Sequence, residues 1–383
     1  MKKFLALILA LVMSLSLVAC GGSKEEAKPA EQPAEQPAEE QGADFSVAMI
    51  TDYGDITDQS FNQTTYEACK AYCEANGVDF NYYKPAGDST AERVAMVEAA
   101  VDDGYTVVVM PGYAFGETIT QVADEYSDIT FIALDVGEGD LGDYTLPSNV
   151  YCAVYQEELC GYMAGYAAVK LGYTHLGFLG GMAVPAVVRY GYGFVQGADA
   201  AATETGADVT MEYVYGNQFW GDADITAYMD NWYQTLGVEV VFACGGGIYA
   251  SAAEAAAKVG GKVIGVDVDQ AAIIDGGYGD GMTVTSAMKG LAPTVEHMLT
   301  EVAAGNFANY GGKIETLGLV SGDDPAANYV QIPMESTQWS DSFSQDDYKA
   351  LVKDMFDGKI TVSNDISAMP QTAITVNEYG NIK

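Results

Sequence analysis

The chain has 383 residues, which is long enough for two domains with separate hydrophobic cores. It contains 54 Asp and Glu residues against 17 Lys and Arg, so its formal net charge is −37 at pH 7. Such acidity favours solubility and argues against a nucleic-acid partner, because a polyanion would be repelled.

The first 19 residues have the pattern of a secretory signal peptide. Two lysines precede an apolar run over 4–18, which is too short for a comfortable transmembrane span. The run ends in Leu-Val-Ala-Cys at 17–20, a sequence that resembles a bacterial lipobox. We therefore expect cleavage before Cys20, a lipid on this cysteine, and a mature protein anchored to the extracytoplasmic face of the cell membrane.

Residues 20–44 then read as a lipidated cysteine followed by a disordered acidic tether. The motif Ala-Glu-Gln-Pro repeats between 30 and 37, and no aromatic or branched apolar residue occurs from 23 to 44. Such a segment cannot bury enough surface to offset the entropy of ordering it. We expect it to hold a folded body away from the membrane.

From residue 45 onward, strand-like and helix-like segments alternate. In the first half we expect strands over 45–50, 78–83, 106–110, 129–134 and 149–154, and helices over 63–76, 89–103, 117–126 and 156–170. Alternation of this regularity predicts a parallel sheet that is covered by helices on both faces.

A second array of the same kind starts at His175. Strands are expected over 176–179, 209–214, 238–243, 262–266 and 283–288, with helices over 185–204, 225–236, 291–303 and 345–357 and a further helix opened by the glycines at 245–247. We expect an N-terminal lobe of 45–170 plus about 290–320, and a C-terminal lobe of 171–289 plus about 321–383. Two doubly wound lobes with facing strand ends would enclose a cleft, as in a closing ligand clamp.

The stretch 50–62 joins the first strand to the first helix. Its turn lies beyond the carboxyl end of a strand, where open α/β sheets bind ligands. Asp52, Phe61 and Asn62 supply a carboxylate, an aromatic ring and an amide that could contact a ligand. The alternative is a turn that only caps the helix, through Asp58 or Ser60.

Three aspartates, Asp52, Asp135 and Asp267, follow predicted strands. An ionised carboxylate accepts hydrogen bonds at two oxygens, so these residues could bind sugar hydroxyls, whereas paired carboxylates for glycoside cleavage are the alternative. Lys289 also follows a strand and could neutralise the cleft and donate to a hydroxyl. Its alternative role is that of a solvated surface lysine.

Aromatic residues are expected on both sides of the cleft. Phe61 of the first lobe and Phe219 or Trp220 of the second could sandwich a flat base, at roughly 1–3 kcal/mol per ring. The alternative is that they are ordinary core or rim residues. Gly246, in the glycine run after a strand, lacks the residues of a phosphate-binding loop, so we expect it to allow close backbone approach to a neutral ligand.

We expect no metal, no cofactor and no catalytic site. The two histidines, His175 and His297, are placed at a strand start and in mid-helix, away from any nucleophile motif. The five cysteines other than Cys20 are scattered, which indicates buried thiols rather than a disulfide framework or a zinc site.

The motif Asp52-x-Gly54-x-Ile56-x-Asp58-x-Ser60-Phe61-Asn62 resembles the signature of the basic membrane protein family of lipoproteins. This family comprises substrate-binding proteins of ABC importers, including purine nucleoside receptors. Further blocks at 180–182, 191–197, 265–270 and 285–289 resemble those of the family in the same order. The resemblance runs from about residue 46 to the C-terminus.

The resemblance implies a type I periplasmic-binding-protein fold with a nucleoside in the interlobe cleft. Phe61 would stack on the base, and Asn62 with Asp52 would bind the edge of the base. The ribose hydroxyls would be held by Asp135, Asp267 and Lys289.

The loop 216–222, Gly-Asn-Gln-Phe-Trp-Gly-Asp, is longer than the corresponding loop of the family pattern. Either Phe219 or Trp220 could supply the second ring, and Trp220 is favoured because Gly221 and Asp222 follow it.

The implied function is that of a lipid-anchored, monomeric receptor that passes a nucleoside, in particular a purine nucleoside, to an ABC permease. A receptor for another small neutral ligand, such as a flavin or a sugar, is the alternative within the binding class. An extracytoplasmic nucleoside hydrolase or glycosidase is the enzymatic alternative. A sensor that docks on a membrane kinase would use the same clamp.

Overall fold

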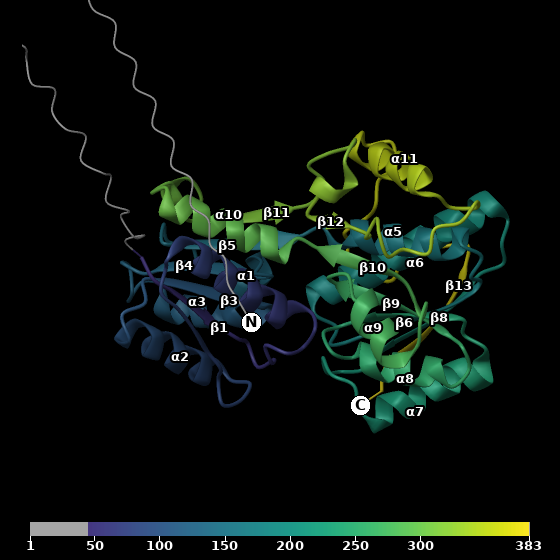
Figure 1. Ribbon diagram of the computed structural model, residues 1–383, viewed down its shortest axis with the longest axis horizontal. Coiled ribbons are helices and arrows are strands. Elements are labelled where there is room, and N and C mark those ends of the chain that lie inside the picture. Colours follow the sequence, from purple (N-terminus) through teal and green to yellow (C-terminus); the bar gives the residue numbers. More distant parts are fainter. Residues whose placement is uncertain (1–44, 383) are drawn as a thin grey trace, which may run out of the picture. The chain divides into compact units, whose positions relative to one another are not determined.

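The structure is a computed structural model that describes residues 45–382. The expected signal peptide, the lipidated Cys20 and the acidic tether lie outside the described residues. The described part consists of two lobes, each built on a largely parallel sheet (Figure 1).

The first lobe contains a six-stranded sheet in the order β11-β5-β4-β3-β1-β2, and all of its strand pairs are parallel. Its strands are β1 (Val47–Ile50), β2 (Phe80–Tyr83), β3 (Val107–Pro111), β4 (Thr130–Leu134), β5 (Val150–Tyr155) and β11 (Lys313–Leu317), and its helices are α1 (Phe61–Asn76), α2 (Thr90–Asp102), α3 (Gly116–Val122), α4 (Glu138–Leu141) and α10 (Leu291–Ala303). Strands β1 and β3 are buried along their whole length, which explains their continuous apolar sequences.

The second lobe contains a seven-stranded sheet in the order β12-β10-β9-β8-β6-β7-β13, in which only β12 runs antiparallel to its neighbour. Its strands are β6 (His175–Gly180), β7 (Thr210–Tyr215), β8 (Val240–Cys244), β9 (Lys262–Asp267), β10 (Thr283–Lys289), β12 (Val330–Gln331) and β13 (Thr375–Asn381), and its helices are α5 (Glu157–Lys170), α6 (Pro185–Thr205), α7 (Ala223–Asn231), α8 (Tyr249–Ala257), α9 (Ala271–Tyr278) and α11 (Gln345–Phe356). A π-helical turn, Trp232–Leu236, follows α7 directly.

Five strands of each sheet repeat one topology. The orders β2-β1-β3-β4-β5 and β7-β6-β8-β9-β10 are the same, so each of these five strands of the first lobe has a counterpart in the second. In such a sheet the order reverses between its first and third strands, and ligands bind outside the carboxyl ends at that point. The expected pair of doubly wound lobes is confirmed.

The later part of the chain returns to both lobes. Helix α10 packs against α1, and β11 adds an edge strand to the first sheet, whereas β12 and β13 form the two edges of the second sheet (Figure 1). These three strands and α9 are not among the elements expected from the sequence. The helix expected over 117–126 also ends early, at Val122.

Helix α5 packs closely along α6, with glycines at the contact. A Cβ at Gly161 would lie 2.2 Å from the carbonyl oxygen of Tyr190, and one at Gly197 would lie 2.0 Å from that of Tyr162. Glycine therefore lets the two backbones approach each other. The lobe boundary expected at residue 170 would assign α5 to the first lobe, whereas α5 contacts α6 and β10 of the second.

Candidate ligand-binding site

A cavity of about 420 Å³ lies between the carboxyl ends of the two sheets. This volume is within the range of small-molecule sites, ~300–1,000 Å³. All nine residues expected to contact a ligand line it: Asp52, Phe61, Asn62, Asp135, Phe219, Trp220, Gly246, Asp267 and Lys289. They come from both lobes, so a ligand in the cavity would touch both.

The turn before α1 is ordered by Asp58. Its carboxylate accepts hydrogen bonds from the backbone N–H groups of Ser60 (2.9 Å), Asn62 (2.9 Å) and Gln63 (3.1 Å). Asp58 therefore satisfies the first turn of the helix, although Ser60 occupies the N-cap position and makes no side-chain cap. This turn sets Phe61 and Asn62 at the start of α1.

Asn62 presents a hydrogen-bond acceptor that is not used inside the protein. Its Nδ2 donates to the Asp58 carboxylate at 3.1 Å, which fixes the orientation of the amide. Its Oδ1 is buried and has no hydrogen-bond partner among residues 45–382. Asp52 lies beside it, and Oδ1 of Asp52 accepts from the backbone N–H groups of Tyr53 and Gly54 at 2.6 and 2.7 Å. Burial raises the pKa of Asp52 above its ordinary value, against these hydrogen bonds.

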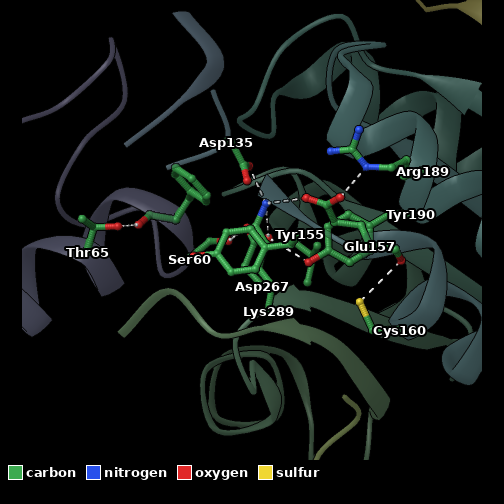
Figure 2. Close-up of polar contacts among 12 residues, drawn as sticks. Ser60, Thr65, Asp135, Tyr155, Glu157, Cys160, Arg189, Tyr190, Asp267 and Lys289 are labelled. Carbon is green, nitrogen blue, oxygen red and sulfur yellow. Dashed lines mark hydrogen bonds and ion pairs between the residues drawn. The ribbon is translucent and has the colours of Figure 1, made fainter. Parts of the chain in front are cut away.

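At the other end of the cavity, Lys289 lies among three carboxylates (Figure 2). Its Nζ is 2.5 Å from Oδ2 of Asp135, 3.4 Å from Oε1 of Glu157 and 3.7 Å from Oδ1 of Asp267. Only 2% of the lysine side chain is exposed, so the alternative of a solvated lysine is excluded. The Nζ also lies 4.7 Å from the ring centroid of Phe61, within the range of a cation–π contact.

The protonation of this cluster follows from burial and charge. Burial raises the pKa of Asp135 to about 6, because the attraction of Lys289 only partly offsets the loss of hydration. Burial alone would lower the pKa of Lys289, but the charges of Asp135, Asp267 and Glu157 raise it. Lys289 is therefore charged at every physiological pH.

Asp135 and Asp267 occupy equivalent places in the two lobes. Asp135 follows β4 and Asp267 ends β9, the corresponding strand of the second sheet. Both have left-handed backbone conformations, with φ of 60° and 65°, which are uncommon for residues other than glycine. The shared conformation turns both carboxylates toward the same lysine.

The aromatic rings differ in exposure and partners. Phe219 is stacked against Tyr53 of the first lobe, with ring centroids 6.4 Å apart and an interplanar angle of 29°. A Cβ at Gly181 would lie 2.3 Å from the Phe219 ring, so glycine is needed there. Trp220 is 56% exposed at the rim. Gly246 has a φ of 52°, and a Cβ at this position would lie 3.0 Å from the carbonyl oxygen of Phe219, so glycine suits both the conformation and the close approach.

Several residues of the site were not anticipated from the sequence. Ser60 donates to Oδ2 of Asp267 across the cleft at 2.6 Å, and Tyr190 donates to Oδ1 of the same aspartate at 3.2 Å. Gln270 donates to the carbonyl oxygen of Gln59 at 3.0 Å and so adds a further bond between the lobes, beside those of Ser60 with Asp267 and Lys289 with Asp135. Tyr190 precedes the glycine-rich block at 191–197, which was the one sequence signal near it.

Behind Lys289 lies a second ion pair that was also missed. Glu157, the first residue of α5, accepts from Nε of Arg189 on α6 at 2.6 Å. Neither residue lines the cavity.

Other features bear on function. The five cysteines in the described part of the chain are buried free thiols, as expected. No group of side chains between residues 45 and 382 has the arrangement of a metal site. None of the helices in the described range is both long and apolar enough to cross a membrane. Neither His175 nor His297 lines the cavity.

Comparison with known proteins agrees with this geometry. The chain is 29% identical over 333 residues to a CD4+ T-cell-stimulating antigen of Listeria monocytogenes, covering 82% of this chain and 87% of the relative. It is 25% identical over 336 residues to the ABC transporter nucleoside-binding protein BmpA of Lactococcus lactis, and this match covers 83% of this chain and 89% of the relative.

A solute-binding protein of an ABC transporter system from Aeropyrum pernix superposes with a TM-score of 0.63 at 22% identity, over 84% of this chain and 88% of the other. This likeness establishes the fold as that of periplasmic binding proteins. Two of the structural neighbours are solute-binding proteins of ABC transporter systems, and the family model that matches the chain is one of substrate-binding proteins.

The family model of PnrA-like ABC transporter substrate-binding proteins, Bmp, matches residues 45–352. The chain therefore belongs to the Bmp family of ABC transporter substrate-binding proteins, which act outside the cytoplasm and hand a small-molecule ligand to a membrane permease.

Proposed function

We propose that the protein is the receptor for a nucleoside, in particular a purine nucleoside. The observation that carries this proposal is that one cavity has two chemically different ends. The aromatic end carries Phe61, Phe219 and the hydrogen-bond acceptors of Asn62 and Asp52. The carboxylate end carries Asp135 and Asp267 beside Lys289, and the two ends meet where the Phe61 ring lies 4.7 Å from Nζ of the lysine. A nucleoside has the same division between a flat base and a sugar with hydroxyl groups.

The carboxylate end suits the ribose. Oδ1 of Asp135 is buried and has no partner among the described residues, so it is available to accept from a hydroxyl. Asp267 lies on the opposite lobe and shares Lys289 with Asp135, so two adjacent hydroxyls could each find a carboxylate. Lys289 can donate to a hydroxyl oxygen while it neutralises both.

The aromatic end suits the base. Phe61 and Phe219 lie on opposite lobes, and a base between them would gain roughly 1–3 kcal/mol per ring. Phe219 is the better candidate for the second ring than Trp220, because Trp220 is more than half exposed. Asn62 Oδ1 and Asp52 would accept hydrogen bonds, which favours a base whose edge carries N–H groups.

The ligand would also add contacts between the lobes to the direct bonds that join them. We assign residues 45–156 with 291–317 to one lobe and 157–290 with 318–382 to the other. A ligand that contacts both at once stabilises the closed state over the open one. The nucleoside-binding relative from Lactococcus lactis supports the same class of cargo.

The proposal extends to attachment: Cys20 carries the lipid and the folded body is a monomer. Replacement of Cys20 by Ala should release the protein from the membrane fraction and abolish incorporation of labelled palmitate. Light scattering of the purified protein should give the mass of one chain. Retention of the Cys20→Ala protein on membranes would contradict lipid anchoring.

The function is tested by a thermal-shift panel on the full-length protein with nucleosides, free bases, sugars and riboflavin. A ligand at 100 times its Kd adds ~2.7 kcal/mol to stability, which is easily seen. We expect purine nucleosides to give the largest shift, and Phe61→Ala and Asp135→Ala each to weaken binding by about tenfold or more. Shifts with sugars alone would favour the second candidate, a sugar receptor, since the carboxylate end by itself could hold a polyol.

A further inference from the structure

We propose that Arg189 and Glu157 act as a positioning pair for the ligand, although neither lines the cavity. Their ion pair directs the charge of Lys289 toward Asp135 and Asp267 and away from Glu157. This inference rests on the proposed function, because it assigns the two aspartates to the sugar hydroxyls.

The geometry forms one continuous chain of charges (Figure 2). Oε2 of Glu157 is 2.6 Å from Nε of Arg189, and Oε1 of the same carboxylate is 3.4 Å from Nζ of Lys289. Lys289 lies closer to Asp135, at 2.5 Å. Glu157 therefore forms its short, charge-assisted hydrogen bond with Arg189 and makes only a longer contact with Lys289.

The side chain of Glu157 is completely buried, so its charge must be compensated inside the protein. Asp135, Glu157 and Asp267 supply three negative charges around Lys289, and Arg189 supplies the second positive charge. Without Arg189, Glu157 would have Lys289 as its remaining cationic neighbour in the cluster. The lysine would then be drawn from the two aspartates that face the cavity.

Other groups around the cluster do not replace Arg189. Tyr155 and Tyr190 pack against Lys289 with neutral rings, at 5.5 and 5.6 Å from Nζ. Asp140 on α4 and Glu158 on α5 are near enough to interact with Arg189, but both are carboxyl groups and neither can supply a positive charge. Loss of the arginine would therefore leave Glu157 and Asp135 with less compensating positive charge.

The sharpest test is a cycle of Arg189→Met, Glu157→Gln and the double variant, with Arg93→Met as the matched control. Arg93 is the chain's other arginine, and it forms a 2.7 Å ion pair with Asp88 in the first lobe, away from Lys289. Binding of inosine and of 2′,3′-dideoxyinosine is measured by calorimetry. The second ligand lacks both hydroxyls that the aspartates would hold.

We expect Arg189→Met to weaken inosine binding by tenfold or more and dideoxyinosine binding by less than threefold. The double variant should recover most of the inosine affinity, because it removes the carboxylate that competes for Lys289. Arg93→Met should bind as the wild type does. Equal losses for both ligands, or no recovery in the double variant, would show that Arg189 only supports the packing of α5 and α6.

A second measurement does not depend on the identity of the ligand. The carboxyl ¹³C resonance of Asp135 in the ligand-free protein should titrate at higher pH in Arg189→Met than in the wild type, and the double variant should reverse this change. An unchanged titration would overturn the positioning role. Failure of the wild type to bind inosine, with the titration as expected, would overturn the proposed nucleoside instead.

Discussion

Replacement of Lys289 by Met tests the electrostatic core of the site. Methionine keeps most of the length of the lysine stem, so the change removes a charge and leaves little empty space. Asp135, Glu157 and Asp267 would then lack the cation that lies within 4 Å of all three. Glu157 would keep Arg189 as a partner.

The expected cost is large because the lysine is buried. Removing one partner of a buried ion pair costs ~3–5 kcal/mol, since it leaves an uncompensated charge in a poorly solvated place. A domain of 150–250 residues loses roughly 2–4 °C in Tm per kcal/mol, so a fall of at least about 6 °C is expected at pH 8. The fall should be smaller at pH 5, where protonation of Asp135 removes part of the unpaired charge.

Thermal and urea denaturation of the full-length protein at pH 5 and pH 8 measure this effect. Lys258→Met is the matched control, because Lys258 makes a 2.9 Å ion pair with Asp230 on the surface and should be nearly silent. A Lys289→Met protein that is as stable as the wild type at pH 8, or equally destabilised at both pH values, would refute the claim that Lys289 compensates the charges of Asp135, Glu157 and Asp267.

Three further predictions concern protonation and packing. The pKa of Asp135 is about 6 in the fold and 3.8 as a free side chain, so between these pH values the folded state binds more protons than the unfolded state. The contribution of Asp135 to stability therefore falls as the pH rises from about 4 to 6. Denaturation midpoints measured from pH 4 to 7 should depend less on pH in Asp135→Asn than in the wild type. Burial raises the pKa of Glu158 to about 7, and its Oε2 has no hydrogen-bond partner among residues 45–382. Glu158→Gln should therefore raise the unfolding free energy in urea titrations by ~1–2 kcal/mol at pH 8 and by less at pH 5.5. A variant that is only as stable as the wild type at pH 8 would contradict this. Gly197→Ala should lower the unfolding free energy by ~1–3 kcal/mol, because its Cβ would meet a carbonyl oxygen of α5. Gly276→Ala, which has open space around it in α9, should instead raise the unfolding free energy by ~0.5–1 kcal/mol. Equal effects of the two substitutions in the same urea titrations would contradict this prediction.

Much of the architecture could be predicted because its signals are local. Most strands of both lobes are short apolar runs, several of which end at or just before Gly, Pro or Asp, and many of the helices between them have clear starts. The strand ends also disclosed Asp52, Asp135 and Asp267, since the carboxyl edge of a parallel sheet is where a ligand site forms. The structure places all three on one cavity.

The elements that were missed lack such signals. Strand β11 is a half-buried edge of five residues, β12 has two residues, and most of β13 is exposed, so tertiary pairing rather than apolar periodicity makes them strands. Helix α9 contains Gly276 and Gly277, which are poor helix formers.

The pairing of Arg189 with Glu157 could not be read from the sequence either. The two residues are 32 positions apart on different helices, and they meet only because the glycines of α5 and α6 let these helices pack closely. Sequence reasoning could identify Asp135 and Lys289 separately, but their direct bond joins residues 154 positions apart.

The most direct test of the central claim is calorimetric titration of the full-length protein with inosine, hypoxanthine and ribose. If the two ends of the cavity recognise base and sugar together, inosine should bind at least 100-fold more tightly than either fragment. Ribose or another sugar that binds as tightly as inosine, or inosine that does not bind, would contradict a nucleoside receptor.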